Sequence, residues 1–340
     1  MSKLSLTQAI NAGLRKAMED DPKVVLLGED IGTLGGVFRV TDGLMKDFGS
    51  HRVIDTPLAE SAIIGTAVGL AYRGFRPVCE IQFDGFIYPG FDQIVSQVAK
   101  LHMRTHGQVR MPLTIRVPFG GGIGSPEHHS ESPEAYFVHT SGLRVISPSS
   151  PQDAYTMLRQ AIASDDPVLY FEPKRRYHTK GEVDLAAPLS AAPEMGSARV
   201  VCAGTDVTLV AYGPLVKTAM DAASAAADEG ISIEVIDLRS LSPLDYPTLI
   251  ESVRRTGRLV IAHEAGKTMG LGAEITATVT ERCFNYLESA PVRVTGFDIP
   301  YPPSKLEKHH LPDLDRILDG VDRALGRTNS QTGMEDYDDR

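Results

Sequence analysis

Two adjacent histidines, His128 and His129, lie in the stretch GGGIGSPEHHSESPEAYF at residues 120–137. Imidazole can transfer protons near neutral pH or ligate a metal. A metal site is disfavoured, because adjacent side chains diverge and neither a ligand four residues away nor a cysteine pair is present. A histidine pair in a loop can equally be exposed or have a structural role. The preceding glycine run favours a ligand site, because glycine lets the backbone approach a ligand closely.

A second candidate is Glu60, in the segment RVIDTPLAESAIIGTAVGLAYRG at residues 52–74. The residues after it are almost all apolar or small, so its carboxyl is expected to be desolvated and suited to proton transfer. The alternative is an ordinary acid in the first turn of a helix, in a capping arrangement begun by Thr56 or Pro57, where it interacts favourably with the helix dipole.

A third candidate is the aromatic segment CEIQFDGFIYPGFDQI at residues 79–94. It follows an apolar run and holds four aromatic side chains: Phe83, Phe86, Tyr88 and Phe91. Aromatic rings in a loop at a strand end can stack on a flat ligand ring. They can equally pack at an interface between domains or subunits.

The elements that position these residues alternate between short apolar runs and amphipathic stretches of helical length. Buried strands are predicted at 24–28, 76–81, 113–117, 167–171, 207–213, 231–238, 258–264 and 291–297. Helices are predicted between them, among others over 61–74 and 91–104, with capping signals at Ser5 and Ser150. Repeated strand–helix units predict parallel sheets with right-handed crossovers, an α/β fold.

The predicted organisation is two α/β domains, at 1–182 and 199–326. A linker rich in Ala, Pro and Ser is expected at 183–198, and the acidic tail at 327–340 is expected to be disordered.

The composition restricts the class of protein. The net charge of −10 disfavours nucleic acid and anionic membrane surfaces as partners. No apolar stretch approaches the roughly 20 residues of a membrane span. The three cysteines are far apart and form neither a metal motif nor a disulfide framework, so a reducing compartment is expected. The N-terminal segment lacks a signal-peptide core, and we expect a cytoplasmic protein.

Taken together, five stretches resemble the β subunits of the thiamine diphosphate-dependent 2-oxoacid dehydrogenases, the decarboxylating components of large multienzyme complexes. The stretches are GEDIGTLGGVFRVTDGL (28–44), RVIDTPLAESAIIG (52–65), EIQFDGFIYPGFDQI (80–94), HHSESPEAYFVH (128–139) and IDLRSLSPLD (236–245). The resemblance implies a transketolase-like pyrimidine-binding domain followed by a transketolase-like C-terminal domain. TPLAE, EIQF and PGFDQI are more similar to the branched-chain 2-oxoacid enzymes than to the pyruvate enzymes.

The resemblance assigns roles to particular residues. Glu60 matches the glutamate that hydrogen-bonds nitrogen N1′ of the cofactor pyrimidine, and Gln82 matches a residue lining the same pocket. Phe86 matches the stacking aromatic, commonly Tyr, and keeps the ring without the hydroxyl. His129 matches the histidine at the active-site entrance that is implicated in acyl transfer to the lipoyl group. Glu131 replaces a common Gln, and its charge is expected to raise the pKa of His129.

Branched-chain members of this family also hold a structural potassium ion through carbonyl groups. By alignment, the resemblance places its ligands at Met111, Leu113, Thr114, Ala161, Ser164 and Asp166.

The resemblance also implies that the chain needs a partner. This cofactor's diphosphate is held by a divalent metal bound through Gly-Asp-Gly and a downstream Asn, whereas this chain has no Gly-Asp-Gly and only three Asn. We therefore expect an α subunit carrying Mg²⁺ in an α₂β₂ heterotetramer, with Gly65 and Gly69 suited to close subunit packing. The acyl group would pass to a lipoyl acyltransferase core.

Four alternatives remain. They are a pyruvate dehydrogenase β subunit, a transketolase-type enzyme working alone, a non-catalytic α/β scaffold and a histidine-dependent metal hydrolase. The missing metal motif argues against the second, and the ligand spacing argues against the last.

Overall fold

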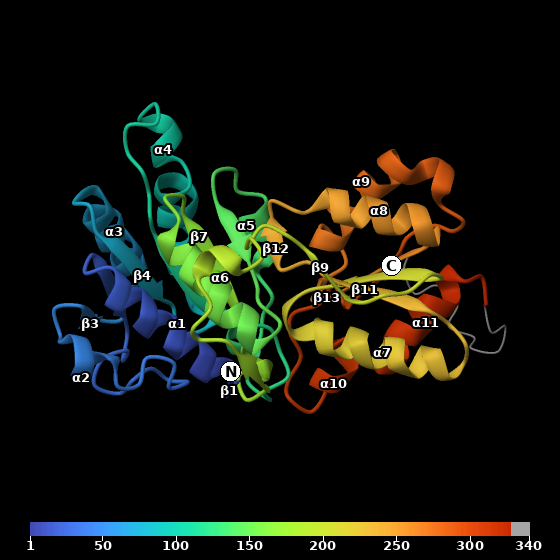
Figure 1. Cartoon of the computed structure of the whole chain (residues 1–340), viewed down its shortest axis with the longest axis horizontal. Helices are drawn as coiled ribbons and strands as arrows, with labels where there is room; N and C mark the ends of the chain where they lie inside the picture. The colour runs from blue at the N-terminus through green and yellow to red at the C-terminus, as the bar shows by residue number, and fades with distance from the viewer. Residues whose placement is uncertain (328–340) are drawn as a thin grey trace.

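The computed structural model describes residues 1–327, which form two α/β lobes lying side by side (Figure 1). The first lobe is built on a sheet of seven strands and the second on a sheet of five. The predicted architecture of two largely parallel sheets with helical connections is confirmed. Apart from Arg327, the tail predicted at 327–340 lies outside the described residues.

The seven-stranded sheet has the order β12-β6-β7-β5-β4-β2-β3. Its strands are β2 (Val24–Gly28), β3 (Val53–Asp55), β4 (Arg76–Glu80), β5 (Thr114–Phe119), β6 (Arg144–Ile146), β7 (Val168–Pro173) and β12 (Ser240–Ser242). All neighbouring strands are parallel except β12, which pairs antiparallel with β6. The carboxyl ends of the neighbours β5, β4, β2 and β3 therefore lie together at one end of the sheet.

Helices cover both faces of this sheet. In β2, Val24 and Leu26 belong to one buried cluster and Val25 and Leu27 to another, because successive side chains point to opposite faces. One face is covered by α1 (Leu6–Asp20) and α6 (Pro151–Ala163). The other is covered mainly by α3 (Glu60–Tyr72), the 3₁₀ segment η1 (Asp84–Gly90), η2 (Gln93–Val98), α4 (Leu101–Arg104) and α5 (Glu134–Val138).

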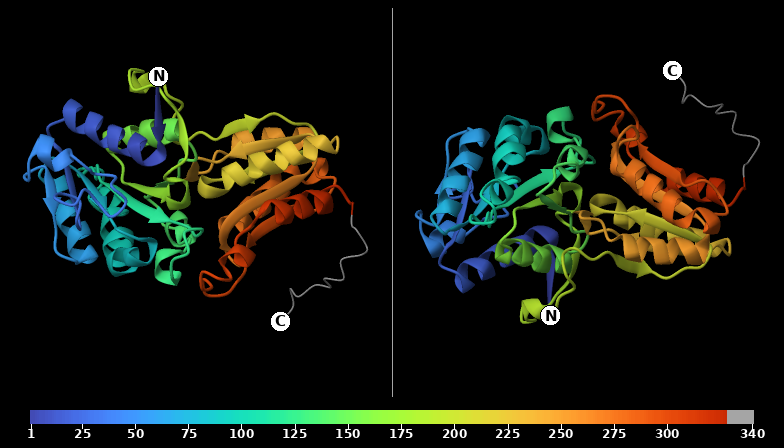
Figure 2. Two further views of the ribbon diagram at one scale, coloured as in Figure 1. Left: turned by 90° about the horizontal axis from the view of Figure 1, so that it is seen from below. Right: turned by 90° about the horizontal axis from the view of Figure 1, so that it is seen from above.

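The five-stranded sheet has the order β14-β13-β10-β11-β9, with only β9 antiparallel to its neighbour. Its strands are β9 (Arg199–Cys202), β10 (Val207–Ala211), β11 (Ile233–Asp237), β13 (Leu259–Gly266) and β14 (Val292–Gly296). One face packs against α7 (Val216–Asp228) and α11 (Leu314–Ala324), and the other against α8 (Tyr246–Thr256) and α9 (Leu271–Cys283). Both views in Figure 2 show these helices packed against the strands of the second lobe.

The remaining elements are short. They are β1 (Ser2–Ser5), which pairs with β8 (Lys180–Val183), together with α2 (Leu44–Phe48), α10 (Glu307–His310) and the 3₁₀ turns η3 (Glu127–His129), η4 (Lys174–Arg176), η5 (Leu189–Ala191), η6 (Gly213–Leu215) and η7 (Phe284–Tyr286). Within residues 1–327, no helix combines the length and apolar character that crossing a membrane would require.

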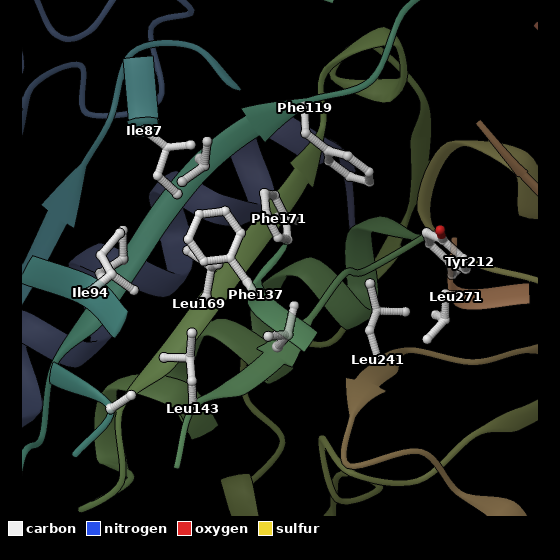
Figure 3. Close-up of a cluster of buried hydrophobic side chains, with 14 of the residues drawn as sticks. Ile87, Ile94, Phe119, Phe137, Leu143, Leu169, Phe171, Tyr212, Leu241 and Leu271 are labelled. Carbon is white, nitrogen blue, oxygen red and sulfur yellow. The ribbon is translucent and has the colours of Figure 1, made fainter. Parts of the chain in front are cut away.

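The two lobes share buried apolar surface. Strand β12 follows β11 of the second lobe in sequence but adds to the sheet of the first. One buried cluster contains Phe137 and Leu143 from the first lobe and Tyr212, Leu241 and Leu271 from later in the chain (Figure 3). A contiguous core of this kind fixes the lobes against each other. The boundaries at 182 and 199 remain our proposal.

The two helix starts predicted from capping residues are confirmed. Ser5 and Gln8 form the predicted capping box, in which each side chain bonds the other's backbone N–H at 3.2 and 2.9 Å. The Ser150 hydroxyl accepts the N–H of Asp153 at 3.2 Å and begins α6 as predicted.

The helix predicted over 91–104 is present but interrupted by a turn at Ala99 and Lys100. The segment contains the π-helical η2, in which the Ala99 N–H donates to the Ile94 carbonyl at 3.0 Å, and then the short α4. The break coincides with a close approach of Gly142, where a Cβ would lie 2.0 Å from the Ala99 carbonyl oxygen.

Candidate functional site

The candidate residues follow the carboxyl ends of four neighbouring parallel strands. Glu29 follows β2, Glu60 follows β3, Gln82 and Phe86 follow β4, and His129 follows β5. Segments separated by up to 100 residues in sequence are thereby brought to one end of the seven-stranded sheet. Ligand sites of open α/β sheets lie at this end.

Glu60 is the first residue of α3 and is only 6% exposed. The alternative capping arrangement is not formed, because the N-cap is Ala59 and the Thr56 hydroxyl has no hydrogen-bond partner among the described residues. No hydrogen bond to the Glu60 carboxyl occurs within residues 1–327 either. The helix N-terminus therefore presents a buried carboxyl with free acceptor capacity.

Glu29 lies close to Glu60 and was missed from the sequence. Its carboxyl is 7% exposed, and its Oε1 atom has no hydrogen-bond partner in the part of the chain that the structure describes. Burial, followed by the negative charge of Glu60, raises the pKa of Glu29. Its position directly after a buried strand was a signal that could have identified it.

Gln82 fixes the loop that carries Glu29. Its amide nitrogen donates to the Asp30 carboxylate at 3.2 Å and to the Glu29 carbonyl at 3.4 Å. Gln82 thus lies beside Glu29, and its role in lining a cofactor pocket stays a prediction.

The aromatic segment and the histidine loop pack against each other. The His129 ring stacks on Phe83, with ring centres 3.8 Å apart, and meets the edge of Phe86 at 5.1 Å. Gly85 permits this contact, because a Cβ there would lie 2.5 Å from the His128 carbonyl oxygen. Phe83 is a further missed residue: it was recognised as part of an aromatic cluster, but no ring contact with His129 was anticipated.

The environment of His129 differs from the sequence expectation. Burial lowers the pKa of His129, so the prediction that Glu131 raises it is wrong. The Glu131 carboxylate is instead bound by the Tyr88 hydroxyl at 2.7 Å. His128 is exposed and lies 3.6 Å from the Glu127 carboxylate. The two histidines are therefore in unlike environments.

A buried ion pair supports this loop. Lys174 pairs with Asp84, and both side chains are fully buried. Asp84 also accepts the backbone N–H of Glu131, and the Glu131 carbonyl accepts the Gly120 N–H at 2.9 Å. No local pattern links Lys174 to a position 90 residues earlier in the chain, so neither member of the pair was predicted.

The glycine-rich loop does not leave its backbone open to a ligand. The N–H groups of Gly121, Gly122 and Gly124 donate to the carboxylates of Glu264 and Glu307 from the second lobe. The expectation of a ligand against these glycines is thus replaced by an internal contact between lobes.

The six positions assigned to potassium fall in two neighbouring segments. Met111 and Leu113 directly precede β5, which begins at Thr114, and Ala161, Ser164 and Asp166 lie at the end of α6 and in the following loop. The segments are joined by hydrogen bonds such as that from the Met111 N–H to the Asp165 carbonyl at 3.2 Å.

Several of these carbonyl groups already accept hydrogen bonds, among them Met111 from the Leu113 N–H at 2.8 Å and Ala161 from the Ser164 N–H at 3.2 Å. The Arg76 guanidinium donates to the Ser164 carbonyl at 2.9 Å and to the Asp165 carboxylate at 2.7 Å. Its positive charge would repel a cation bound by the same carbonyl. Potassium at these positions stays a prediction, and no step proposed below depends on it. Within residues 1–327, no group of three or more His, Cys, Asp or Glu side chains is arranged to hold a metal ion.

Both lobes match known domain families. Residues 2–180 match the family described as transketolase, pyrimidine binding domain, and residues 196–317 match the transketolase C-terminal domain. The chain is also similar to a split-gene transketolase, solved as an inactive β4 tetramer, with a TM-score of 0.76 and 23% identity over 95% of this chain and 98% of that one. At this identity, the likeness concerns the fold alone.

Several curated relatives are much more similar in sequence. The chain is 57% identical to the pyruvate dehydrogenase E1 component subunit β of Leifsonia xyli, over 95% of both chains. It is 56% identical to the 3-methyl-2-oxobutanoate dehydrogenase subunit β of Mycobacterium tuberculosis, over 95% of this chain and 92% of the relative. A third relative, the 2-oxoisovalerate dehydrogenase subunit β of Pseudomonas aeruginosa, is 45% identical over 96% of both.

The names of these relatives state different 2-oxoacids. All three, however, are β subunits of 2-oxoacid dehydrogenases. Their similarity extends over almost the whole chain, including the four strand ends that carry Glu29, Glu60, Gln82, Phe86 and His129. The chain therefore belongs to the family of 2-oxoacid dehydrogenase E1 β subunits.

Proposed function

We propose that the chain is the β subunit of an α₂β₂ thiamine diphosphate-dependent dehydrogenase that decarboxylates branched-chain 2-oxoacids and acylates a lipoyl group. The observation that carries this proposal is the buried Glu29–Glu60 pair, which shares one end of the sheet with Phe86 and His129. A scaffold subunit has no need for two desolvated carboxyls side by side.

The free acceptor atoms fit the pyrimidine half of the cofactor. The Glu29 Oε1 atom and the Glu60 carboxyl lack hydrogen-bond donors among residues 1–327, as expected of groups that receive a ligand's ring nitrogen and amino group. Thiamine diphosphate, when bound, supplies the electron sink that takes up the electron pair released as carbon dioxide leaves. Phe86 would offer its ring to the pyrimidine, and Gln82 would keep the Glu29 loop in position.

Glu60 and His129 are proposed to take part in proton transfer. Glu60 would hydrogen-bond pyrimidine nitrogen N1′ of the bound cofactor and share its proton, and the charge of Glu60 contributes to the raised pKa of Glu29 beside it. The lowered pKa of His129 makes its imidazolium form a stronger acid. Once protonated, His129 can give a proton to the lipoyl sulfur that leaves when the S–S bond opens and the other sulfur takes the acyl group.

The partner would supply the rest of the site. This chain has neither Gly-Asp-Gly nor a suitable Asn for a Mg²⁺–diphosphate anchor, so an α subunit carrying both is proposed. The outer face of α3 is free to pack against another subunit: a Cβ on Gly69 would meet no described atom within 4 Å, and nearby Leu58 is 76% exposed. The cytoplasm remains our proposal for its location.

The choice of substrate rests on the sequence motifs TPLAE, EIQF and PGFDQI. The second candidate substrate is pyruvate. The 57% identity to a pyruvate dehydrogenase subunit supports pyruvate, and the 56% identity to a 3-methyl-2-oxobutanoate dehydrogenase subunit supports the branched-chain acid about equally. The test compares kcat/KM for 2-oxoisovalerate and pyruvate on the enzyme reconstituted with its α subunit. A higher value for pyruvate would reject the branched-chain assignment.

The scaffold alternative has its own test. Isothermal titration of thiamine diphosphate and Mg²⁺ into the purified α–β pair should give saturable binding. Replacing Glu60 by a bulky residue should abolish that binding without separating the subunits. A pair that never binds the cofactor would favour the scaffold.

A further inference from the structure

The glycine-rich loop has a backbone shape that points its N–H groups outward. Gly120, Gly122 and Gly124 have φ values of +83°, +90° and +73°, a region that other residues rarely adopt. Backbone of this kind makes N–H groups available to anions. The loop closes on itself through the Gly120–Glu131 backbone bond, and it contains His129.

The anions that occupy this loop are two carboxylates of the second lobe. Glu264, at the end of β13, accepts the Gly121 N–H at 2.9 Å. Glu307, the first residue of α10, accepts the Gly122 N–H at 2.7 Å and the Gly124 N–H at 3.1 Å. The two glutamates are only 5% and 9% exposed, so these charge-assisted bonds are shielded from water.

The contact between Glu307 and the glycine-rich loop is also tightly packed. The Tyr301 hydroxyl donates to Glu307 at 2.7 Å, and a Cβ on Gly121 would lie 1.9 Å from that hydroxyl oxygen. Glu264 is held separately by Arg175, at 2.7 Å. Glu307 bonds only Tyr301 and the loop among the described residues, so its contribution to the loop can be tested in isolation.

On these contacts we propose that Glu307 is a positioning residue for His129, which fixes the histidine loop from the second lobe for the acyl-transfer step. This inference rests on the role of His129 in the proposed function. Two contacts within the first lobe hold one side of the loop: the His129 ring stacks on Phe83, and the Glu131 N–H donates to Asp84. Glu307 and Tyr301 hold the other.

The test uses the α–β holoenzyme with thiamine diphosphate and Mg²⁺, assayed for two partial reactions. Decarboxylation is followed with ferricyanide as artificial oxidant, and reductive acylation with the isolated lipoyl domain. Glu307→Gln places an amide donor opposite the Gly124 N–H, so acylation should fall about tenfold, the factor for one lost charge-assisted hydrogen bond. Decarboxylation should stay within about twofold. Tyr301→Phe, a milder change, should produce a smaller loss in the same step.

The matched control is Asp206→Asn, which alters a carboxylate that accepts the Ser232 N–H at 2.7 Å within the second lobe. It should leave both partial reactions unchanged. Equal loss of both reactions in Glu307→Gln, or no loss in either, would overturn the positioning role.

Amide hydrogen exchange over residues 120–131 gives a second readout that needs no turnover. Exchange there should speed up in Glu307→Gln and not in Asp206→Asn, and unchanged protection would overturn the inference. A wild-type holoenzyme that decarboxylates no 2-oxoacid would reject the proposed function instead, while the exchange data would still decide whether Glu307 holds the loop.

Discussion

Glu134 is a fully buried carboxyl whose protonation should control stability across neutral pH. It lies at the start of α5, accepts a hydrogen bond from the Tyr212 hydroxyl at 2.5 Å and leaves its Oε2 atom without a partner among the described residues. Burial raises its pKa from 4.5 to about 7, with Glu264 and Asp84 adding negative potential. The perturbation is Glu134→Gln, which keeps an acceptor for Tyr212 and removes the ionisation.

The magnitude follows from linkage. Because the folded-state pKa is raised from 4.5 to about 7, the protonated carboxyl adds about 3 kcal/mol to the free energy of unfolding. This contribution is fully present below pH 4.5 and is lost as the pH rises through 7. Glutamine cannot ionise and avoids that loss. Its amide N–H₂ replaces the unpaired oxygen, however, and an unsatisfied donor costs about 1 kcal/mol. The variant should therefore be more stable by about 2 kcal/mol at pH 8, and the advantage should vanish near pH 5.

Thermal unfolding of wild type and variant, measured side by side from pH 5 to pH 8.5, checks this. About 2 kcal/mol corresponds to a rise in Tm of about 4 °C at pH 8. Glu194→Gln, at an exposed glutamate, provides a control that should show no such pH-dependent difference. A Tm difference that is the same at both ends of the range would refute the reasoning, because a packing effect does not titrate.

Four further predictions concern the site. Glu60→Gln should leave the fold and the α–β assembly intact and reduce decarboxylation at least 100-fold, consistent with loss of general acid–base catalysis; near-normal turnover would reject its role. His129→Ala should slow lipoyl acylation more than ferricyanide-linked decarboxylation, whereas equal losses would count against a separate role in acyl transfer. Gly85→Ala should displace the His128 carbonyl, since the added Cβ would lie 2.5 Å from its oxygen, and should lower Tm together with acylation. The predicted potassium site is tested by measuring Tm in matched K⁺ and Na⁺ buffers: a bound ion should raise Tm in K⁺ alone, whereas equal Tm values would reject the site, in line with the Arg76 donation to the Ser164 carbonyl.

The local elements were predictable because their signals are local. β2 was predicted from the apolar run VVLLG and begins and ends at the same residues, Val24–Gly28, in the structure. The capping residues Ser5 and Ser150 bond their own first turns. Once the strands are known to be parallel, residues after their carboxyl ends must lie together, so the neighbourhood of Glu60 and His129 followed from topology.

Other parts of the site depended on contacts that no local pattern records. The helix predicted over 91–104 is interrupted where Gly142 approaches the backbone, and β12 joins the sheet of the other lobe. The raised pKa of Glu29 and the lowered pKa of His129 come from burial, which only the folded packing sets.

The sequence by itself determined the α/β fold and most strands and helices, and it predicted that the proposed site residues Glu60 and His129 follow strands of one parallel sheet. Only the tertiary structure decided what holds them in place. Glu307 lies 185 residues beyond Gly122, yet its carboxylate accepts that N–H. No local sequence pattern links a carboxylate to a glycine N–H so far away, because their bond forms only where the two lobes pack against each other.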